Sequence, residues 1–302
     1  MIIVTYRKVF FAITGVIVIA ALISLFAFGL HLSTEFTGGT LIEVRYEVER
    51  PAADALSDAL GSAGVSEYTV RESGTNGFTV RAGTISAETR TNLSQILSIG
   101  GAYQAQIDRL SEVGPTIGKE LRNKSILAIS LVLVCILLFI AFAFRKVSTP
   151  VSSWVYGGAA IVALVHNIII TFGFFAALGY FFGAQVDTLF VTAILTVLGF
   201  SVHDTIVVFD RLRENLRLNQ ESRKKEDFEM TAGKSLNQTF VRSVNTSLTV
   251  LVTLLALFFL GPVSTQDFAL TLLVGIIAGT YSSIALATPL LVTYERWKAK
   301  RV

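Results

Sequence analysis

The sequence predicts a polytopic α-helical membrane protein with six spans and one α+β domain between the first and second spans. Three observations support this fold class. Hydrophobic residues make up 52% of the 302 residues and charged residues only 16%, compared with roughly 25% charged in an average soluble domain. Six stretches are apolar over the length of about 20 residues that a bilayer requires. Residues 31–124 instead have the mixed composition of a water-exposed domain.

Composition also excludes several classes of protein. A mean hydropathy of +0.63 is incompatible with a cytosolic enzyme, a secreted disulfide scaffold or a disordered regulator. The single cysteine, Cys135, lies in an apolar run, so no intrachain disulfide is possible. The net charge of +3 is too small to indicate a nucleic-acid partner, and we expect none.

The six spans are predicted at residues 9–30, 125–144, 154–178, 188–209, 240–260 and 268–292. The first span is not expected to be a cleaved signal peptide, because its apolar run is too long and no A-x-A-like site follows it. The chain therefore divides into residues 1–30 (N-terminus and first span), residues 31–124 (outer domain) and residues 125–302 (the other five spans).

Positive charges predict the orientation of the spans. The N-terminus, the 145–153 loop, the 210–239 loop and the C-terminal tail contain Arg7, Lys8, Arg145, Lys146, Arg211, Arg213, Arg217, Arg223, Lys224, Lys225, Lys234, Arg296, Lys298, Lys300 and Arg301. The loops near 179–187 and 261–267 contain no lysine or arginine. Because cytoplasmic loops are enriched in these residues, both termini and the 210–239 loop are predicted to be cytoplasmic. Interspersed acidic residues favour a solvated helical connection in the 210–239 loop.

The outer domain shows an alternation of strand and helix patterns. Strand-like segments are predicted at 40–47, 67–72, 78–85 and 103–110, and helical segments after Pro51 and after Ser86. The order βαββαβ predicts a ferredoxin-like α+β fold. No nucleophile–base pair, metal cluster or phosphate loop is evident, so the domain is predicted to be a contact module. Substrate binding, a spacer role and a subunit contact all stay open.

Two charged residues fall within the predicted spans, Asp204 and Arg242. Spans of sufficient length cannot be drawn without them, because Leu189–Phe200 and Leu248–Leu260 are too short alone. An intramembrane charge costs about 2.5–3.5 kcal/mol on insertion scales, and such residues are functional candidates by default. Two structural alternatives stay open: Arg242 could extend to the interface, and Asp204 could be a hydrogen-bonded packing residue.

Polar side chains around these residues recur at helical spacing. One stripe comprises Gln238, Arg242, Asn245, Thr246, Thr249 and Thr253; the other comprises Thr188, Thr192, Thr196, Gly199 and His203. Two such stripes would be costly in lipid, so they are expected to face each other or another helix. A carboxylate that exchanges a proton beside a fixed cation is a relay, with Asn245, Thr246 and His203 as accessory groups.

His166 and Asn167 form a further polar pair, in the middle of the third span. A histidine at this position could join a proton path, and the alternative is a packed hydrogen-bonding anchor. In the sixth span, Gly275 and Gly279 form a Gly-x-x-x-Gly face, followed by two serines. This pattern predicts close helix packing rather than chemistry.

Five segments carry a resemblance to a known family. They are Glu35–Thr40 (EFTGGT) with Gly38 and Gly39; Val113–Leu121 (VGPTIGKEL) with Gly114 and Pro115; Gly199–Asn215 (GFSVHDTIVVFDRLREN) with Asp210 and Arg211; Leu236–Thr249 (LNQTFVRSVNTSLT); and Asp267–Ile284 (DFALTLLVGIIAGTYSSI). In content and order they resemble SecF within the SecD/SecF family of bacterial protein-export membrane proteins, part of the resistance–nodulation–division superfamily. The third segment is highly specific, whereas the glycine pairs alone are not.

The resemblance implies a subunit of the bacterial cytoplasmic (inner) membrane that pairs with SecD beside the SecYEG channel, with YajC and SecA as further partners. It implies that the proton-motive force promotes export of unfolded polypeptides through a lipid bilayer, with Asp204 as the proton-carrying carboxylate and Arg242 as its membrane arginine. Two positions depart from the family pattern: Glu35 stands where relatives usually have aspartate, and Asn167 where they often have aspartate. The second departure puts a titrating role at position 167 in doubt.

Three function classes compete on the sequence alone. The first is this translocation subunit. The second is half of a proton-driven small-molecule or lipid exporter, although such exporters normally carry two outer loops and twelve spans. The third is an intramembrane enzyme, which would need a second intramembrane aspartate or more zinc ligands than His166, His203 and Asp204 provide. No cofactor or metal is expected, and the coupling ion could be H⁺ or Na⁺.

Overall fold

The computed structural model describes residues 2–65, 67–145, 151–223 and 226–300. Lys146, Lys224, Lys225 and Arg301, four of the basic residues used to predict orientation, lie outside the described residues. The chain forms two compact units. One comprises Leu32–Ile126 and Gln185–Thr188, and the other comprises Met1–His31, Leu127–Ala184 and Leu189–Val302. Each unit is described by itself below.

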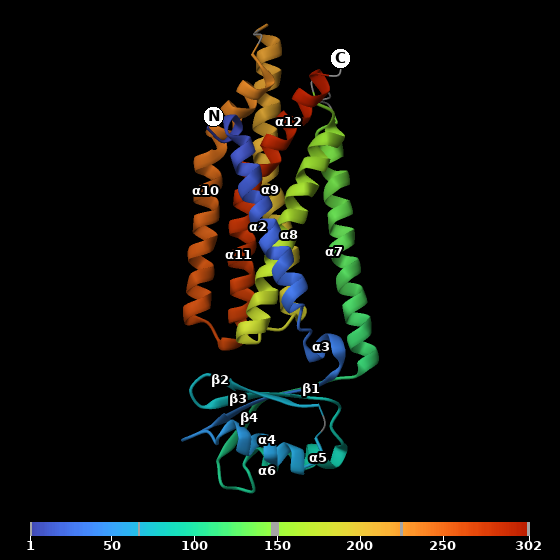
Figure 1. Ribbon diagram of the computed structural model, residues 1–302, viewed down its shortest axis with the longest axis vertical. Helices are drawn as coiled ribbons and strands as arrows, with labels where there is room; N and C mark the ends of the chain where they lie inside the picture. The colour runs from blue at the N-terminus through green and yellow to red at the C-terminus, as the bar shows by residue number, and fades with distance from the viewer. Residues whose placement is uncertain (1, 66, 146–150, 224–225, 301–302) are drawn as a thin grey trace. The chain divides into compact units, whose positions relative to one another are not determined.

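The smaller unit is an α+β domain. Its elements are α3 (Thr34–Thr37), β1 (Gly39–Tyr46), α4 (Ala53–Ser62), β2 (Thr69–Ser73), β3 (Gly77–Ala82), α5 (Ala87–Thr91), α6 (Leu93–Leu97) and β4 (Ala105–Val113). The four strands lie in the order β2-β3-β1-β4, and all neighbours are antiparallel. Figure 1 shows α4, α5 and α6 together on one face of this sheet. The arrangement confirms the predicted ferredoxin-like βαββαβ fold.

Buried and more exposed side chains alternate along β1, so one face of the sheet forms the core of this unit. Every second residue, including Ile42, Val44 and Tyr46, is buried, because successive side chains of a strand point to opposite faces. They pack with Leu56 and Leu60 of α4 and with core residues of β3 and α6. The prediction of one helix after Ser86 needs a correction: α5 and α6 are separated at Asn92, where ψ is 5° rather than helical.

The larger unit contains the six membrane helices, except that residues 115–126 and Thr188, where two of them begin, belong to the smaller unit. They are α2 (Arg7–Phe28), the α7 helix (Pro115–Ala143), α8 (Ser153–Phe182), α9 (Thr188–Glu221), α10 (Phe228–Leu260) and the sixth helical segment, made of η1 (Val263–Thr265), α11 (Gln266–Ser282), the π-helical η2 (Ser283–Ala287) and α12 (Thr288–Ala299). A short α1 (Ile2–Thr5) precedes them. Within the described residues, six helical segments are long and apolar enough to cross a membrane, as predicted.

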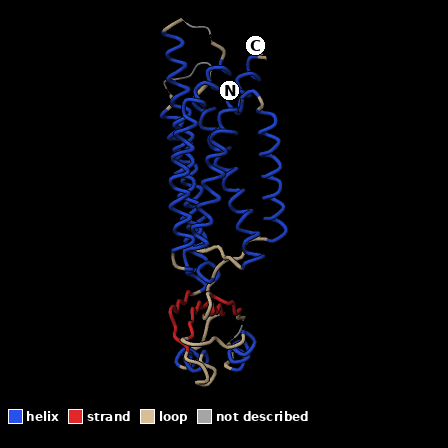
Figure 2. The backbone as a smooth tube through the Cα atoms, turned by 90° about the vertical axis from the view of Figure 1, so that its left-hand side faces the viewer, coloured by secondary structure: helices blue, strands red, loops and turns tan. Residues whose placement is uncertain are grey.

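Several helices extend beyond the predicted spans. The α7 helix begins at Pro115, where a missing N–H and a fixed φ suit the first helical turn. Most of the predicted 210–239 loop is helical, because α9 continues to Glu221 and α10 begins at Phe228. The N-terminus, the α9–α10 connection and the C-terminus lie at the same end of this unit (Figures 1 and 2).

Small residues set the closest helix contacts. A Cβ atom on Gly173 of α8 would lie 2.4 Å from the carbonyl oxygen of Ala21 in α2, and Ser24 donates a hydrogen bond to the Gly173 carbonyl (2.7 Å). A Cβ on Gly275 of α11 would lie 2.3 Å from a methyl group of Val197 in α9. The predicted Gly-x-x-x-Gly face therefore does bring two helices close together.

Candidate functional site

Asp204 lies in the interior of the helical unit. Its side chain projects from α9, and the residue is only 7% exposed. The hydroxyl groups of Ser243 in α10 and Ser283 in η2 lie beside the carboxyl group, which also interacts electrostatically with His203 and Arg242. Among the described residues, Asp204 Oδ2 and Ser243 Oγ are both buried without a hydrogen-bond partner. Three helical segments thus converge on one carboxyl group that keeps unused hydrogen-bonding capacity.

Hydrogen bonds connect the surroundings of Asp204 to α8. Thr205 Oγ1 and Ser283 Oγ are 2.8 Å apart, and Ser283 Oγ also donates to the Ser201 carbonyl (3.4 Å). The amide of Asn167 donates to Ser201 Oγ over 2.7 Å, and His166 Nδ1 lies 3.0 Å from Asn167 Oδ1. His166, Asn167, Ser201, Thr205 and Ser283, together with Asp204 and Ser243, are here called the polar cluster. All seven of its residues are buried.

The π-helical segment η2 shapes one wall of the polar cluster. Pro289 follows shortly after it and lacks the N–H that would bond the Ala285 carbonyl in a regular α-helix. A wider π turn accommodates this loss, and such turns occur frequently at functional sites. All five residues of η2 are buried. The wider turn brings Ser283 within hydrogen-bonding distance of Thr205, a contact that the sequence pattern alone does not reveal.

The structure separates the two predicted relay residues. Asp204 is buried, whereas Arg242 is exposed on α10. In the part of the chain that the structure describes, no ion pair joins them, although they remain within electrostatic range. His203, Asn245 and Thr246 are also exposed in this chain. The side chain of α10 that lies beside Asp204 is instead Ser243, which is not a member of the predicted polar stripe.

Both predicted polar stripes lie at the surface of the chain rather than against each other. On α9 the exposed members are Thr192, Thr196, Gly199 and His203, and on α10 they are Gln238, Arg242, Asn245, Thr246, Thr249 and Thr253. Three threonines satisfy their hydroxyl groups within their own helix: Thr196 donates to Thr192, Thr249 to Asn245 and Thr253 to Thr249, over 2.8–3.1 Å. Among the described residues, the guanidinium group of Arg242 makes no hydrogen bond or ion pair.

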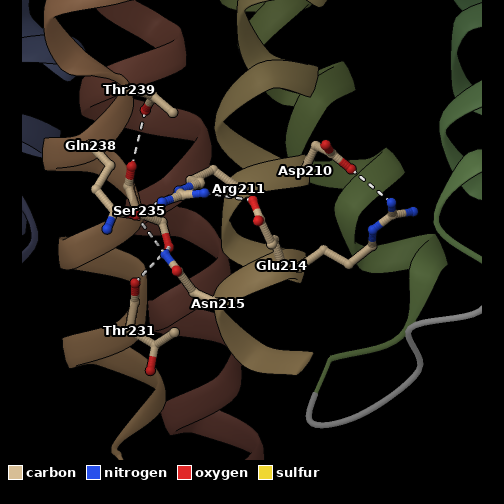
Figure 3. A network of polar contacts seen from close by, with 9 residues as sticks. Asp210, Arg211, Glu214, Asn215, Thr231, Ser235, Gln238 and Thr239 are labelled. Atoms are coloured by element: carbon tan, nitrogen blue, oxygen red, sulfur yellow. Dashed lines mark hydrogen bonds and ion pairs between the residues drawn. The ribbon is translucent and has the colours of Figure 1, made fainter. Parts of the chain in front are cut away.

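Asp210 and Arg211 lie farther along α9, in a second polar network (Figure 3). Asp210 pairs with Arg213 (2.9 Å), and Arg211 contacts Glu214 (2.6 Å). Figure 3 shows Arg211 and Asn215 pointing from α9 toward α10. Arg211 Nε donates to Gln238 Oε1 (2.7 Å), and Asn215 Nδ2 donates to Ser235 Oγ (2.8 Å) and to Gln238 Oε1 (2.9 Å). This network fixes the register of α9 against α10.

The glycine pair of the smaller unit has a packing role. Gly38 and Gly39 have φ values of 83° and 126°, a region that side chains rarely adopt. A Cβ on Gly38 would lie 2.7 Å from the Cα of Pro115, and one on Gly39 would lie 2.5 Å from the Ala82 carbonyl oxygen. Gly114, by contrast, has open space around its Cα. The pair therefore joins the start of β1 closely to the start of the α7 helix and the end of β3.

No group of three or more His, Cys, Asp or Glu side chains in the described residues is arranged to hold a metal ion. His166 contacts Asn167 and stacks on Tyr281, with ring centroids 6.2 Å apart. His203, by contrast, is exposed. What the polar cluster can do chemically is bind a proton at Asp204 and rearrange hydroxyl hydrogen bonds across three helices.

Comparison with known proteins identifies the family. Residues 23–48 match the family described as "SecD/SecF GG Motif", and residues 95–297 match "Protein export membrane protein SecD/SecF, C-terminal". The chain is 46% identical to the protein translocase subunit SecF of Thermobaculum terrenum, covering 97% of this chain and 93% of that protein. The chain belongs to the SecD/SecF family. The corresponding subunit of Anaerolinea thermophila is 40% identical, covering 96% of this chain and 92% of that protein.

A solved structure of the SecD/SecF family has the same fold. The crystal structure of SecDF from Thermus thermophilus, a translocon-associated membrane protein, superposes with a TM-score of 0.83 at 33% identity. The match covers 97% of this chain but only 38% of that longer chain. A structure of SecDF in a super-membrane-facing form gives a TM-score of 0.65. The SecD/SecF C-terminal region includes the entire polar cluster, and the GG motif region includes Glu35, Gly38 and Gly39.

Proposed function

We propose that this chain is the SecF-type subunit of a protein translocase and that proton exchange at Asp204 supplies energy for polypeptide export. The observation that carries the proposal is the burial of this carboxyl group. Among the described residues, Asp204 is the only Asp, Glu, Lys or Arg in the buried class. One charge moved through 100 mV provides about 2.3 kcal/mol, so a proton that passes this position can drive a helix rearrangement.

The polar cluster supplies a way for protonation to change the packing. A charged Asp204 attracts Arg242 and His203 and accepts hydrogen bonds from the hydroxyl groups beside it. A neutral Asp204 loses that attraction and becomes a donor. Because Ser243, Ser283 and Thr205 come from three segments, a change at one carboxyl group alters the contacts that α10 and η2 make with α9. This is a local electrostatic change at a site where several helices meet.

The exposed polar stripes support a membrane partner. Arg242 and Asn245 would be costly against lipid, and the remedy is a neighbouring helix that carries polar groups. The long SecDF chain, of which this chain matches 38%, motivates the choice of SecD as that neighbour. We propose that the stripes of α9 and α10 form the SecD interface and place Arg242 there, near Asp204 but not bonded to it.

The proposed orientation places both termini in the cytoplasm and the α+β domain outside. It rests on the concentration of lysine and arginine at the end of the helical unit that contains the termini and the α9–α10 connection. In a Cys135→Ser background, a membrane-impermeant thiol reagent should label Ser94→Cys but not Ser222→Cys in intact cells. Both positions are exposed, and the reverse labelling pattern would overturn the orientation.

The decisive test is export in cells whose only copy carries Asp204→Asn. This substitution keeps the shape of the side chain and removes the titratable group. Export should fall to the level of cells without the protein, while the variant still accumulates and co-purifies with SecD. Glu221→Gln on the same helix is the matched control, because Glu221 is exposed and pairs with Arg217 one helical turn away; it should export normally. Normal export by Asp204→Asn would overturn the proposal.

A further inference from the structure

Glu35 belongs to the GG motif segment, and its carboxylate bonds to Thr188, a residue of the same compact unit. It lies in the single helical turn α3, which Ser33 begins as N-cap by accepting a hydrogen bond from the Glu35 amide (3.3 Å). The Glu35 Oε2 atom accepts two hydrogen bonds from one residue, Thr188. The donors are its backbone N–H, at 2.9 Å, and its hydroxyl group, at 2.7 Å.

Thr188 is the first residue of α9. The N–H groups of the first helical turn have no partner within the helix, and a negative charge at this end is favoured by the helix dipole. N-cap residues normally supply such an acceptor from the adjacent sequence. The Thr188 N–H donates to an acceptor at position 35, more than 150 positions away in the sequence. Glu35 therefore acts as a long-range cap on the helix that contains Asp204.

The segment that holds Glu35 is itself fixed. Residues Gln185–Thr188 belong to the same compact unit as Leu32–Ile126. The Ser33 amide donates to the Val186 carbonyl (2.9 Å), and Leu32 and Val186 form a parallel bridge. On its other side, the glycine pair leaves no room between the segment, Pro115 and Ala82. A displacement of Thr188 must therefore move this segment or break its bonds to Glu35.

We infer that Glu35 is a positioning residue that clamps the first turn of α9 to the GG motif segment and so transmits movement between Asp204 and the α+β domain. The inference rests on the proposed function. The two residues of α9 involved, Thr188 and Asp204, are 16 positions apart, or about 24 Å along a helix. A continuous helix is stiff over this length. The chain passes from one compact unit to the other between Thr188 and Leu189, and both partners of the clamp belong to the unit that contains the α+β domain.

The clamp predicts a graded variant series. Glu35→Ala removes the acceptor of both hydrogen bonds, whereas Glu35→Gln keeps one acceptor oxygen without the charge. Thr188→Val removes the hydroxyl donor but keeps the backbone donor and the side-chain shape, and Thr188→Ser keeps both donors. Because Glu35 and Thr188 act through the same bonds, Glu35→Ala combined with Thr188→Val should be no more defective than Glu35→Ala alone. If the two residues instead acted independently, the defect of the double variant would equal the sum of the two single defects.

The experiment uses the full chain, assembled with SecD in proteoliposomes. One spin label is placed on Cys135, which is the only cysteine and is exposed, and a second on Ser94→Cys in the α+β domain. The distance between the labels is measured at two pH values, and protonation of Asp204 is followed by its carboxyl infrared band, assigned by its loss in Asp204→Asn. Glu88→Ala, an exposed acidic residue in the first turn of α5, is the control variant.

In the unmodified protein and in Glu88→Ala, the label distance should depend on pH. In Glu35→Ala the Asp204 band should still respond to pH, while at least half of the pH-dependent distance change is lost. Glu35→Gln, Thr188→Val and Thr188→Ser should show progressively smaller losses. A full distance change in Glu35→Ala overturns the clamp and leaves the role of Asp204 intact. A full distance change in Asp204→Asn instead overturns the proposed function. If Glu35→Ala does not fold, the other three variants decide the question.

Discussion

The contact between α11 and α9 at Gly279 gives a quantitative test of how the polar cluster is held together. A Cβ atom at this position would lie 3.0 Å from the Cβ of Ser201, 3.1 Å from its Oγ and 3.6 Å from Asn167 Nδ2. Non-bonded carbon atoms prefer a separation of about 3.5–4.0 Å. In Gly279→Ala, Ser201 must therefore move away from α11 by a few tenths of an ångström, which also strains its hydrogen bond with Asn167.

The expected loss of stability follows from three contributions. Overpacking of this kind costs about 1–3 kcal/mol. Weakening an interhelical hydrogen bond in a membrane protein costs about 0.6 kcal/mol. Replacing glycine by alanine in a helix returns up to about 1 kcal/mol. The net destabilisation of Gly279→Ala is therefore about 1–3 kcal/mol. Gly158→Ala in α8 is the matched control, because nothing lies within 4 Å of its added Cβ, and it should be neutral or stabilising.

The assay is reversible unfolding of the purified protein in mixed micelles with increasing denaturing detergent. Ser201→Gly removes the atoms that collide with the new methyl group, so the double variant should lose less stability than the two single variants together. Equal stability of Gly279→Ala and Gly158→Ala would refute the packing argument. Strict additivity in the double variant would refute the assignment of the collision to Ser201.

Two further predictions concern regions outside the polar cluster. Burial raises the pKa of Tyr46 to about 12 from its usual 10, and its hydroxyl group donates to the Leu97 carbonyl (2.9 Å). The stabilisation is complete below pH 10 and is lost as the pH rises toward 12, by up to about 3 kcal/mol. Tyr46→Phe should abolish this slope in denaturant titrations from pH 9 to 12, and an unchanged slope would contradict the assignment. Asn215→Ala should destabilise the α9–α10 pair by about 1–3 kcal/mol, because it removes two hydrogen bonds between the helices, to Ser235 Oγ and Gln238 Oε1. Exposed Arg217→Ala should cost under about 0.5 kcal/mol, and equal losses would contradict the network's role.

The six spans and the α+β topology could be predicted from the sequence because each depends on local patterns. An apolar run of sufficient length has few alternatives in a bilayer, and the alternation along 40–47 specifies which face of β1 is buried. The helical connection favoured at 210–239 is present, but the sequence did not predict that it consists of continuations of the two membrane helices, α9 to Glu221 and α10 from Phe228. The hydrogen bonds of Arg211 and Asn215 to α10 hold these extensions together.

The candidate site could be predicted only in part. Asp204 was found because no span of sufficient length excludes it. The sequence did not indicate that Ser243 and Ser283 lie beside Asp204. Their proximity depends on which face α10 turns toward α9 and on the π turn of η2, and both are properties of the tertiary structure. Ser283 did have a signal, as it follows the Gly275–Gly279 face. The Glu35–Thr188 contact joins residues far apart in sequence, and no local pattern indicates it.

The π turn at Ser283–Ala287 also has a rotational consequence. Each residue in an α-helix advances the helical wheel by about 100°, so an extra residue accommodated in one turn changes the phase of everything that follows. Upstream, Gly275 and Gly279 face α9; downstream, Leu291 and Val292 are completely buried. Because of the wider turn, both the glycine face of α11 and the apolar face of α12 can pack against neighbouring helices. Loss of a single residue from η2 would leave the sequence of α12 unchanged yet turn its apolar face away from the helices that now cover it.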